Sequence, residues 1–194
     1  MKLIIENLEP EVSEWLLLEY KHSSIIWKGD VIFTNVKPKD APKFEGLGKV
    51  ERRRFYEVAD NLIILDPRAR KILEPKDFQN RDYIVIGGIL GDEVPQGRTE
   101  KLVSEVARER CSAIFRNLGK VQLPIDQAAL VARLIMNGKR FEEIEIQNGV
   151  EIILEERKDY IHSIQLPYGY VRIGGKIKFA PGFVEFIKKQ GWNI

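Results

Sequence analysis

A glycine-rich loop between residues 83 and 99 is the stretch of this sequence whose residue types and spacing best suit ligand binding. The apolar run Tyr83–Ile86 predicts a buried strand, and Gly87, Gly88 and Gly91 follow it. Glycine lets the backbone bend sharply and approach a ligand closely. Because open α/β sheets bind ligands at the carboxyl ends of their parallel strands, this loop is a predicted binding site.

The spacing of this loop differs from that of three well-known motifs. Its glycines read Gly-Gly-x-x-Gly instead of the Gly-x-Gly-x-x-Gly of dinucleotide-binding folds, and Pro95 prevents a helix from starting directly behind them. Arg98 stands where a nucleoside-triphosphate loop needs a lysine, and no Gly-x-Ser-x-Gly sequence provides a nucleophilic serine. A surface loop without function is the alternative interpretation, but the length of the loop and its acidic residues Asp92 and Glu93 favour a ligand site.

A second loop, between a predicted strand and a predicted helix, has a similar character. It spans residues 116–126 and carries apolar side chains on both sides of Gly119, among them Leu118 and Leu123. Such a loop would present backbone N–H and C=O groups to a flat ring held between aliphatic walls. The alternative is a buried connection in which Asp126 only caps the following helix.

The elements that must position these loops alternate between apolar strands and helices. Predicted strands are Leu3–Glu6, Val31–Val36, Asn61–Leu65, Tyr83–Ile86 and Ser112–Phe115, and predicted helices are Ser13–Lys21, Glu51–Glu57, Glu100–Arg110 and Asp126–Asn137. Continuous apolar strands separated by helices are typical of an α/β fold with a mostly parallel sheet and helices on both faces. Ser13 and Thr99 are expected helix caps, and Gly138 is expected to end the helix before it. That helix is apolar almost all round, which predicts burial in the core or in a dimer interface.

Beyond residue 140 the sequence changes to a β-rich pattern. Expected features are charged and apolar segments at Glu142–Ile146 and Glu151–Glu155, strands around Leu166–Tyr170, a hairpin turn at Gly174-Gly175 and a last helix over Pro181–Gln190. We therefore divide the chain into residues 1–140 and a C-terminal extension, residues 141–194, that packs on the first part.

Composition limits the classes of protein and of site. A hydrophobic fraction of 44% in 194 residues excludes a disordered chain, and a net charge of +2 argues against a strongly electrostatic nucleic-acid binder. One cysteine excludes an internal disulfide and a thiolate cluster, and two distant histidines make a metal site unexpected. No apolar run reaches the roughly 18 residues of a membrane span. We expect a cytoplasmic protein.

Together these motifs resemble the SPOUT class of S-adenosylmethionine-dependent methyltransferases. The resemblance is strongest to the branch that contains the fungal arginine methyltransferase of a small-subunit ribosomal protein and its archaeal relatives. It covers nearly the whole chain and rests on Leu65–Ala69, Pro75-x-Asp77-Phe78, Ile86–Asp92, Gly97–Thr99, Arg116–Gly119 and Gln122–Asp126, with Glu14-Trp15, Glu19-Tyr20 and Leu166–Tyr168 as further positions.

The resemblance implies a fold and a cofactor that composition does not show. SPOUT proteins tie a deep trefoil knot in the carboxyl half of the sheet, so residues 1–140 would form a knotted methyltransferase core. S-adenosyl-L-methionine would bind bent between three knot loops. The residues implied to bind it are Leu65, Asp66, Gly87, Gly88, Ile89, Gly91, Leu118, Gly119, Gln122, Leu123 and Asp126.

The resemblance also implies a methyl transfer, whose catalysis is mostly positioning. If the acceptor is an arginine, a nearby carboxylate would stabilise its guanidinium and could take its proton. Asp92 is the first candidate, followed by Glu93 and Glu19, although each could be a plain surface charge. Arg98 is expected to pair with the cofactor carboxylate or an acceptor phosphate, or to anchor its loop through Asp92.

The acceptor that the resemblance implies is an arginine of a ribosomal protein. An RNA methyltransferase is the alternative, because most SPOUT enzymes modify RNA and residues 49–54 (Lys-Val-Glu-Arg-Arg-Arg) could contact phosphates. A module that binds the cofactor without catalysis is a third hypothesis. The protein could be a homodimer, like many SPOUT enzymes, or a monomer, like the fungal relative, with the extension 141–194 covering the knot surface that other members use to dimerise.

Overall fold

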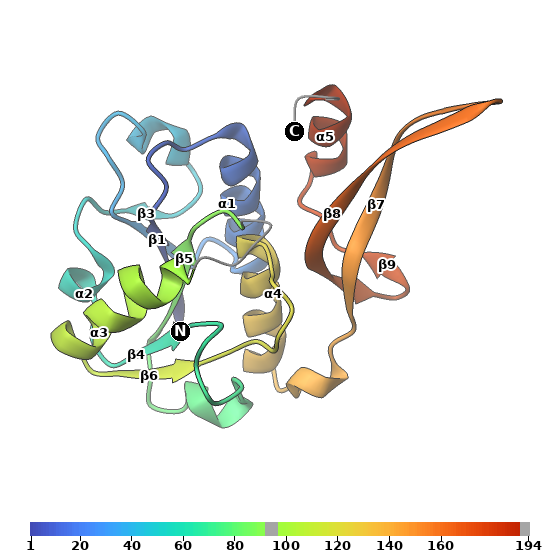
Figure 1. Cartoon of the computed structure of the whole chain (residues 1–194). Coiled ribbons are helices and arrows are strands. Elements are labelled where there is room, and N and C mark those ends of the chain that lie inside the picture. Colours follow the sequence, from blue (N-terminus) through green and yellow to red (C-terminus); the bar gives the residue numbers. More distant parts are fainter. Residues whose placement is uncertain (92–96, 191–194) are drawn as a thin grey trace.

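A six-stranded parallel sheet forms the centre of the protein, seen here in a computed structural model that describes residues 1–91 and 97–190 (Figure 1). Its strand order is β3-β2-β1-β5-β4-β6, and every pair of neighbours runs parallel. The strands are β1 (Lys2–Asn7), β2 (Val31–Thr34), β3 (Lys49–Val50), β4 (Leu62–Leu65), β5 (Tyr83–Gly88) and β6 (Ala113–Arg116). The predicted parallel sheet is confirmed, and its order places β4 and β5 side by side near the middle.

Helices cover both faces of this sheet, as the continuous apolar strands predicted. Helices α1 (Glu14–Ile26) and α4 (Ile125–Met136) lie on one face, over a core that includes Leu3, Phe33 and Ile84. Helices α2 (Phe55–Val58) and α3 (Glu105–Arg110) lie on the other, over a core that includes Ile4 and Val85. Short helical turns complete this part at Ala41–Phe44, Pro75–Phe78, Glu100–Ser104 and Phe141–Glu143.

Local sequence signals explain the ends of the two long helices. The hydroxyl oxygen of Ser13 accepts a hydrogen bond from the backbone N–H of Leu16 at 3.2 Å and caps α1, as expected. Gly138 has a φ of 100° directly behind α4, a conformation that favours glycine and ends the helix. The side chain of Trp27 donates to the carbonyl oxygen of Ala129 at 3.0 Å, so α4 packs on the end of α1 within the same chain.

Two predicted helix features are wrong for identifiable reasons. Residues 51–54 are not helical, because the backbone of Glu51 continues the parallel pairing: its N–H donates to Phe33 and its carbonyl oxygen accepts from Val36. The helix in this region is limited to α2, Phe55–Val58. Thr99 does not cap the next helix, because its own backbone is already helical (φ −60°, ψ −42°) and its side chain makes no capping hydrogen bond. That helix opens with the π-helical turn Glu100–Ser104 and continues as α3.

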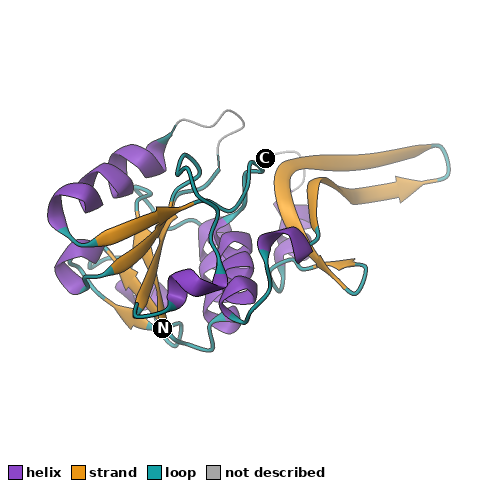
Figure 2. Cartoon of the chain, turned by 90° about the horizontal axis from the view of Figure 1, so that it is seen from below, coloured by secondary structure: helices purple, strands orange, loops and turns teal. Residues whose placement is uncertain are grey.

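A second, antiparallel sheet follows residue 145. It has the order β7-β8-β9, and α5 packs against it. Its elements are β7 (Ile146–Arg157), β8 (Tyr160–Ile173), β9 (Lys176–Ile177) and α5 (Phe183–Gln190). The predicted hairpin at Gly174-Gly175 is confirmed, with φ of 60° and 74° at the two glycines. Residues 166–170 lie within one long strand instead of forming a pair. Figure 2 shows the β7–β8 hairpin extending away from the rest of the molecule.

The loops behind β4 and β6 run side by side. The N–H of Asn117 donates to the carbonyl oxygen of Lys71 at 2.8 Å, and the N–H of Leu73 donates to that of Asn117 at 3.0 Å. A trefoil knot in this half of the sheet stays a prediction, as does the division of the chain at residue 140. Within residues 1–91 and 97–190, no helix is both long and apolar enough to cross a bilayer.

Candidate functional site

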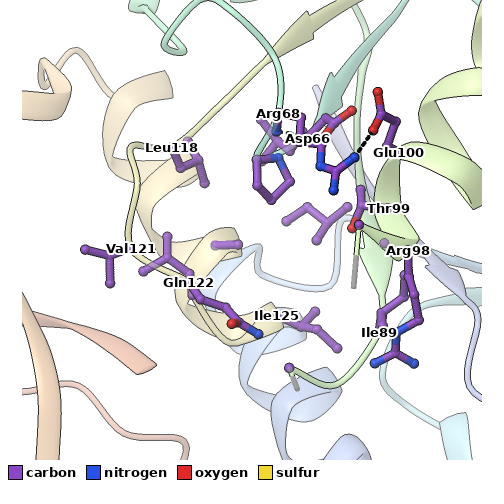
Figure 3. Close-up of a pocket in the computed structure, with 18 of the residues that line it drawn as sticks. Asp66, Arg68, Ile89, Arg98, Thr99, Glu100, Leu118, Val121, Gln122 and Ile125 are labelled. Carbon is purple, nitrogen blue, oxygen red and sulfur yellow. Dashed lines mark hydrogen bonds and ion pairs between the residues drawn. The ribbon is translucent and has the colours of Figure 1, made fainter. Parts of the chain in front are cut away.

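A cavity of about 240 Å³ opens at the carboxyl ends of β4 and β5, where the sequence predicted a ligand site (Figure 3). Its walls come from the loop behind β4, the glycine loop behind β5, the start of the π-helical turn, and the loop that leads into α4. Its lining residues are Leu65, Asp66, Pro67, Arg68, Ile86, Gly87, Ile89, Leu90, Gly91, Gly97, Arg98, Thr99, Glu100, Leu118, Gly119, Lys120, Val121, Gln122, Leu123, Ile125 and Ala128. Mostly apolar walls with a few polar groups are typical of small-molecule sites.

Nine of the eleven predicted cofactor-binding residues line this cavity. They are Leu65, Asp66, Gly87, Ile89, Gly91, Leu118, Gly119, Gln122 and Leu123. Arg98 lines it as well, whereas Gly88, Asp126 and Glu19 do not. The first candidate for catalysis, Asp92, lies outside the residues that the structure describes, together with Glu93. The geometry thus brings three separate loops together, and the roles of their residues stay predictions.

Asp66 shapes the cavity by holding two of its walls together. Its carboxylate accepts the backbone N–H of Arg68 at 2.9 Å and the hydroxyl of Ser104 at 2.5 Å. Only 2% of the residue is exposed. The π-helical turn carries Ser104 to this point, and such turns are frequent at functional sites. Asp66 therefore ties the loop behind β4 to the helix that follows the glycine loop.

Arg98 anchors the glycine loop to the end of β1. Its guanidinium donates to the carbonyl oxygen of Leu90 at 2.7 Å and to the carboxylate of Glu9 at 3.1 Å, and Glu9 also accepts the N–H of Leu90 at 3.0 Å. These contacts favour the anchoring interpretation of Arg98. They run through Glu9, a residue that the sequence analysis did not single out.

A second arginine spans the rim of the cavity. Arg68 pairs with the carboxylate of Glu100 at 2.5 Å, and this ion pair is drawn in Figure 3. Gly97 has a φ of 67°, a conformation that favours glycine, and a Cβ atom there would stand 2.7 Å from the end of the Arg68 guanidinium. The sequence analysis gave neither member of the pair a role. The motif that contains Arg68 was the available signal, whereas nothing in the local sequence distinguishes Glu100.

Gly88 faces α1 instead of the cavity. A Cβ atom at this position would stand 2.3 Å from the hydroxyl oxygen of Tyr20, a contact that real structures do not tolerate. That hydroxyl donates to the side-chain oxygen of Asn7 at 2.9 Å. The need for glycine here follows from the packing of β5 against α1.

Glu19 and Asp126 belong to a buried polar cluster behind the cavity. Glu19 accepts the indole N–H of Trp15 at 2.7 Å and the backbone N–H of Ile125 at 2.8 Å. Asp126 lies 2.6 Å from the Nδ1 of His22. Desolvation, and then the nearby charge of Asp126, raise the pKa of Glu19 to about 8. Both acids are turned away from the cavity, although Ile125 between them lines it.

The buried cluster also corrects the interpretation of Asp126 as a plain helix cap. The residue at the cap of α4 is Pro124, and Asp126 lies inside the first turn. Its carboxylate accepts from the amide of Gln127 at 2.9 Å, and the same amide donates to the carbonyl oxygen of Lys178 at 2.8 Å. The cluster therefore links the start of α4 to the second sheet.

The chain matches one protein-family model over residues 2–192, that of the "Protein arginine N-methyltransferase SFM1-like" family. It is 29% identical over 210 residues to the protein arginine N-methyltransferase SFM1 of Saccharomyces cerevisiae. That match covers 98% of this chain and 95% of the yeast protein. The resemblance stated from the motifs is thereby confirmed.

Solved structures agree with the sequence match. The yeast arginine methyltransferase SFM1 complexed with SAM superimposes with a TM-score of 0.86 at 29% identity, over 98% of this chain and 91% of that chain. The yeast enzyme has also been solved with SAH and with MTA. Trm10 from Thermococcus kodakaraensis has a TM-score of 0.61 at 17% identity, over 74% of this chain and 96% of that chain, which indicates a shared fold alone. These neighbours are SPOUT-fold methyltransferases, as the motifs implied.

Proposed function

Because this chain belongs to the family of SFM1-like protein arginine N-methyltransferases, we propose that it transfers a methyl group from S-adenosyl-L-methionine to an arginine of a ribosomal protein. The observation that carries the proposal is the cavity behind β4 and β5, which nine residues predicted from the sequence line together. The yeast relative, an arginine methyltransferase solved with SAM, supports the cofactor and the class of acceptor.

The cavity suits the proposed cofactor in shape and in chemistry. Leu118, Val121 and Ile125 provide aliphatic walls for a flat ring. The carboxylate of Asp66 and the amide of Gln122 supply polar groups at the same cavity. The cofactor would supply a methyl group on a sulfonium, which needs no metal, and the work of the protein is to align the acceptor nitrogen with it.

The acceptor guanidinium needs a carboxylate close to the reacting nitrogen. A guanidinium stays charged at neutral pH, so an anion must stabilise it and accept its proton. Of the carboxylates that the structure describes in the cavity, Asp66 is only 2% exposed and already accepts from Ser104 and from the N–H of Arg68, so an acceptor guanidinium cannot reach it. Glu100 is partly exposed at the rim and already holds one guanidinium, that of Arg68. We assign this role to Glu100 and keep Asp92 as the second candidate, whereas Glu19 is too deeply buried to reach the acceptor.

The charges on the chain favour a protein acceptor over RNA. In the basic segment 49–54, Lys49 and Arg53 both pair with Glu51, and Arg54 pairs with the buried carboxylate of Glu6. Arg54 is therefore neutralised within the chain, and Lys49 and Arg53 share the single charge of Glu51, so part of the positive charge of this segment is already balanced. RNA-binding surfaces present an excess of unpaired lysine and arginine, whereas the net charge of this chain is only +2. We infer that the acceptor is a ribosomal protein and that the reaction takes place in the cytoplasm.

Packing within the chain favours a monomer. Helix α4, which is apolar almost all round, is covered by α1 and by the second sheet of the same chain. Its apolar surface therefore needs no second copy to bury it.

The test combines cofactor binding with methyl transfer. We expect calorimetric titration with S-adenosylhomocysteine to give micromolar binding, and labelled S-adenosylmethionine to label a ribosomal protein in a ribosomal extract. Ala128→Leu should weaken the binding of S-adenosylhomocysteine at least tenfold, because Ala128 lines the cavity from α4, where leucine is a good helix former. The unfolding temperature of the ligand-free variant serves as the control for folding.

Each alternative has its own result in this test. Label that is removed by ribonuclease and resists protease would identify an RNA acceptor. Binding of S-adenosylhomocysteine without any labelled product would support the third hypothesis, a module that binds the cofactor without catalysing methyl transfer. A folded wild-type protein that does not bind S-adenosylhomocysteine would overturn the methyltransferase proposal.

A further inference from the structure

The second sheet touches two of the three loops that surround the cavity. The contact is made by Tyr168 and Gly169 of β8, which meet Gly91 of the glycine loop and Gln122 of the loop before α4. We call these four residues the seam. Gly91 and Gln122 line the cavity, whereas the two residues of β8 do not.

Hydrogen bonds join the two sides of the seam. The hydroxyl of Tyr168 donates to the carbonyl oxygen of Gly91 at 2.8 Å. The backbone N–H of Gly169 donates to the carbonyl oxygen of Gln122, also at 2.8 Å. One short stretch of β8 thus fixes the backbone of two loops that are 31 positions apart in the sequence (residues 91 and 122).

The seam is also packed too closely to admit further atoms. A Cβ atom at Gly91 would stand 2.4 Å from the side-chain amide nitrogen of Gln122 and 2.6 Å from the ring of Tyr168. A Cβ atom at Gly169 would stand 2.5 Å from the side chain of Val121. Close packing on both sides leaves the loops little freedom to move relative to β8.

We propose that Tyr168 is a positioning residue for the cofactor, through which the C-terminal sheet holds the cavity in its binding conformation. The inference rests on the proposed function, since the ligand of the cavity is taken to be S-adenosylmethionine. Tyr168 acts on the cofactor through Gly91, not by touching it. Its hydroxyl holds the carbonyl oxygen of Gly91 in the glycine loop, and the N–H of the neighbouring Gly169 holds the carbonyl oxygen of Gln122, so both loops are set before the cofactor arrives.

The substitution Tyr168→Phe tests this role with the smallest possible change. It removes the hydrogen bond to Gly91 and leaves the ring in place. Tyr160→Phe is a matched control: Tyr160 lies on the same strand and its hydroxyl donates to Glu155 at 2.7 Å, near the turn between β7 and β8. Calorimetric titration with S-adenosylhomocysteine, the KM for S-adenosylmethionine and the unfolding temperature of the ligand-free protein are measured for all three proteins.

We expect Tyr168→Phe to raise the dissociation constant of S-adenosylhomocysteine and the KM about three- to tenfold, the range of one hydrogen bond. We expect its kcat and ligand-free unfolding temperature to stay close to wild type, and Tyr160→Phe to bind normally. Wild-type affinity in Tyr168→Phe would overturn the inference alone. A weaker affinity matched by a clear loss of ligand-free stability would also overturn it, since the role would then be structural. A wild-type protein without affinity would overturn the proposed function first.

Discussion

Acidic residues lie on both sides of the segment that leads into α4, and they differ in what they face: the cavity on one side and a buried polar cluster on the other. On one side Asp66 and Glu100 face the cavity. On the other, Glu19 and Asp126 are 5% and 3% exposed, in a cluster that includes His22. Both regions contain residues of the type that the expected chemistry needs.

The difference shows that the direction in which the backbone points an acidic side chain decides whether that side chain can reach a ligand in the cavity. Ile125 turns its side chain towards the cavity and gives its N–H to Glu19 behind it. Glu19 therefore shapes the cavity wall from outside and cannot reach a ligand within it. Glu100, in contrast, is partly exposed and has a single described partner, Arg68. Glu100 is therefore available for function, whereas Glu19 and Asp126, like the buried Asp66, hold the walls of the cavity. Three substitutions test that division, in order of their expected effect on unfolding.

Asp126→Ala should have the largest effect on stability. It removes the partner of His22 and of the Gln127 amide in a fully buried place, and breaking such contacts costs about 3 kcal/mol. Urea denaturation measures the loss. The affinity of the folded protein for S-adenosylhomocysteine should change less than about threefold, because Asp126 does not line the cavity. A stability loss below about 1 kcal/mol together with lost binding would reverse the division of roles.

Glu19→Gln should change how stability depends on pH. The pKa of Glu19 is raised to about 8 in the folded protein, chiefly by desolvation, from an ordinary value of 4.5. Above pH 4.5 the unfolded chain releases this proton while the folded protein keeps it, so the stabilising contribution is full below pH 4.5 and is lost as the pH rises towards 8. Glutamine is neutral at every pH, so residue 19 of the variant causes no loss of stability as the pH rises.

The measurement compares urea denaturation of Glu19→Gln and wild type at several pH values. Relative to wild type, the variant should gain about 2 kcal/mol between pH 5 and pH 7. Parallel curves for the two proteins would show that Glu19 is ionised in the fold.

The sequence was sufficient to predict the sheet and the place of the cavity. Runs such as Leu62–Leu65 and Tyr83–Ile86 are short and apolar or aromatic throughout, a pattern typical of strands buried on both faces of a parallel sheet. Glycines at the ends of such strands then mark the binding edge. The short helix at 51–57 was mispredicted because a charged stretch carries no period that distinguishes a helix from an edge segment paired through its backbone.

Contacts between distant segments were beyond the reach of the sequence. Gly88 and Gly91 look alike in the sequence, yet one packs on Tyr20 of α1 and the other on Tyr168 of β8. Glu9 and Glu100 carry no local signal, because their partners Arg98 and Arg68 come close only after the loops are folded. The buried pairing of Asp126 with His22, 104 positions away, could not be predicted for the same reason.

Glu100→Gln should have the smallest effect on stability and a large effect on methyl transfer. Its ion pair with Arg68 lies at a partly exposed rim, where such pairs are worth less than about 1 kcal/mol. Because we assign its carboxylate to the acceptor guanidinium, the rate of labelled methyl transfer should fall at least about tenfold while S-adenosylhomocysteine binds as before. Glu143→Gln is the matched control, since Glu143 pairs with Arg140 at 2.9 Å outside the cavity and its loss should leave transfer unchanged. If Glu100→Gln transfers methyl groups at the wild-type rate, the rim carboxylate has no part in the reaction, and the search for the proton acceptor moves to Asp92.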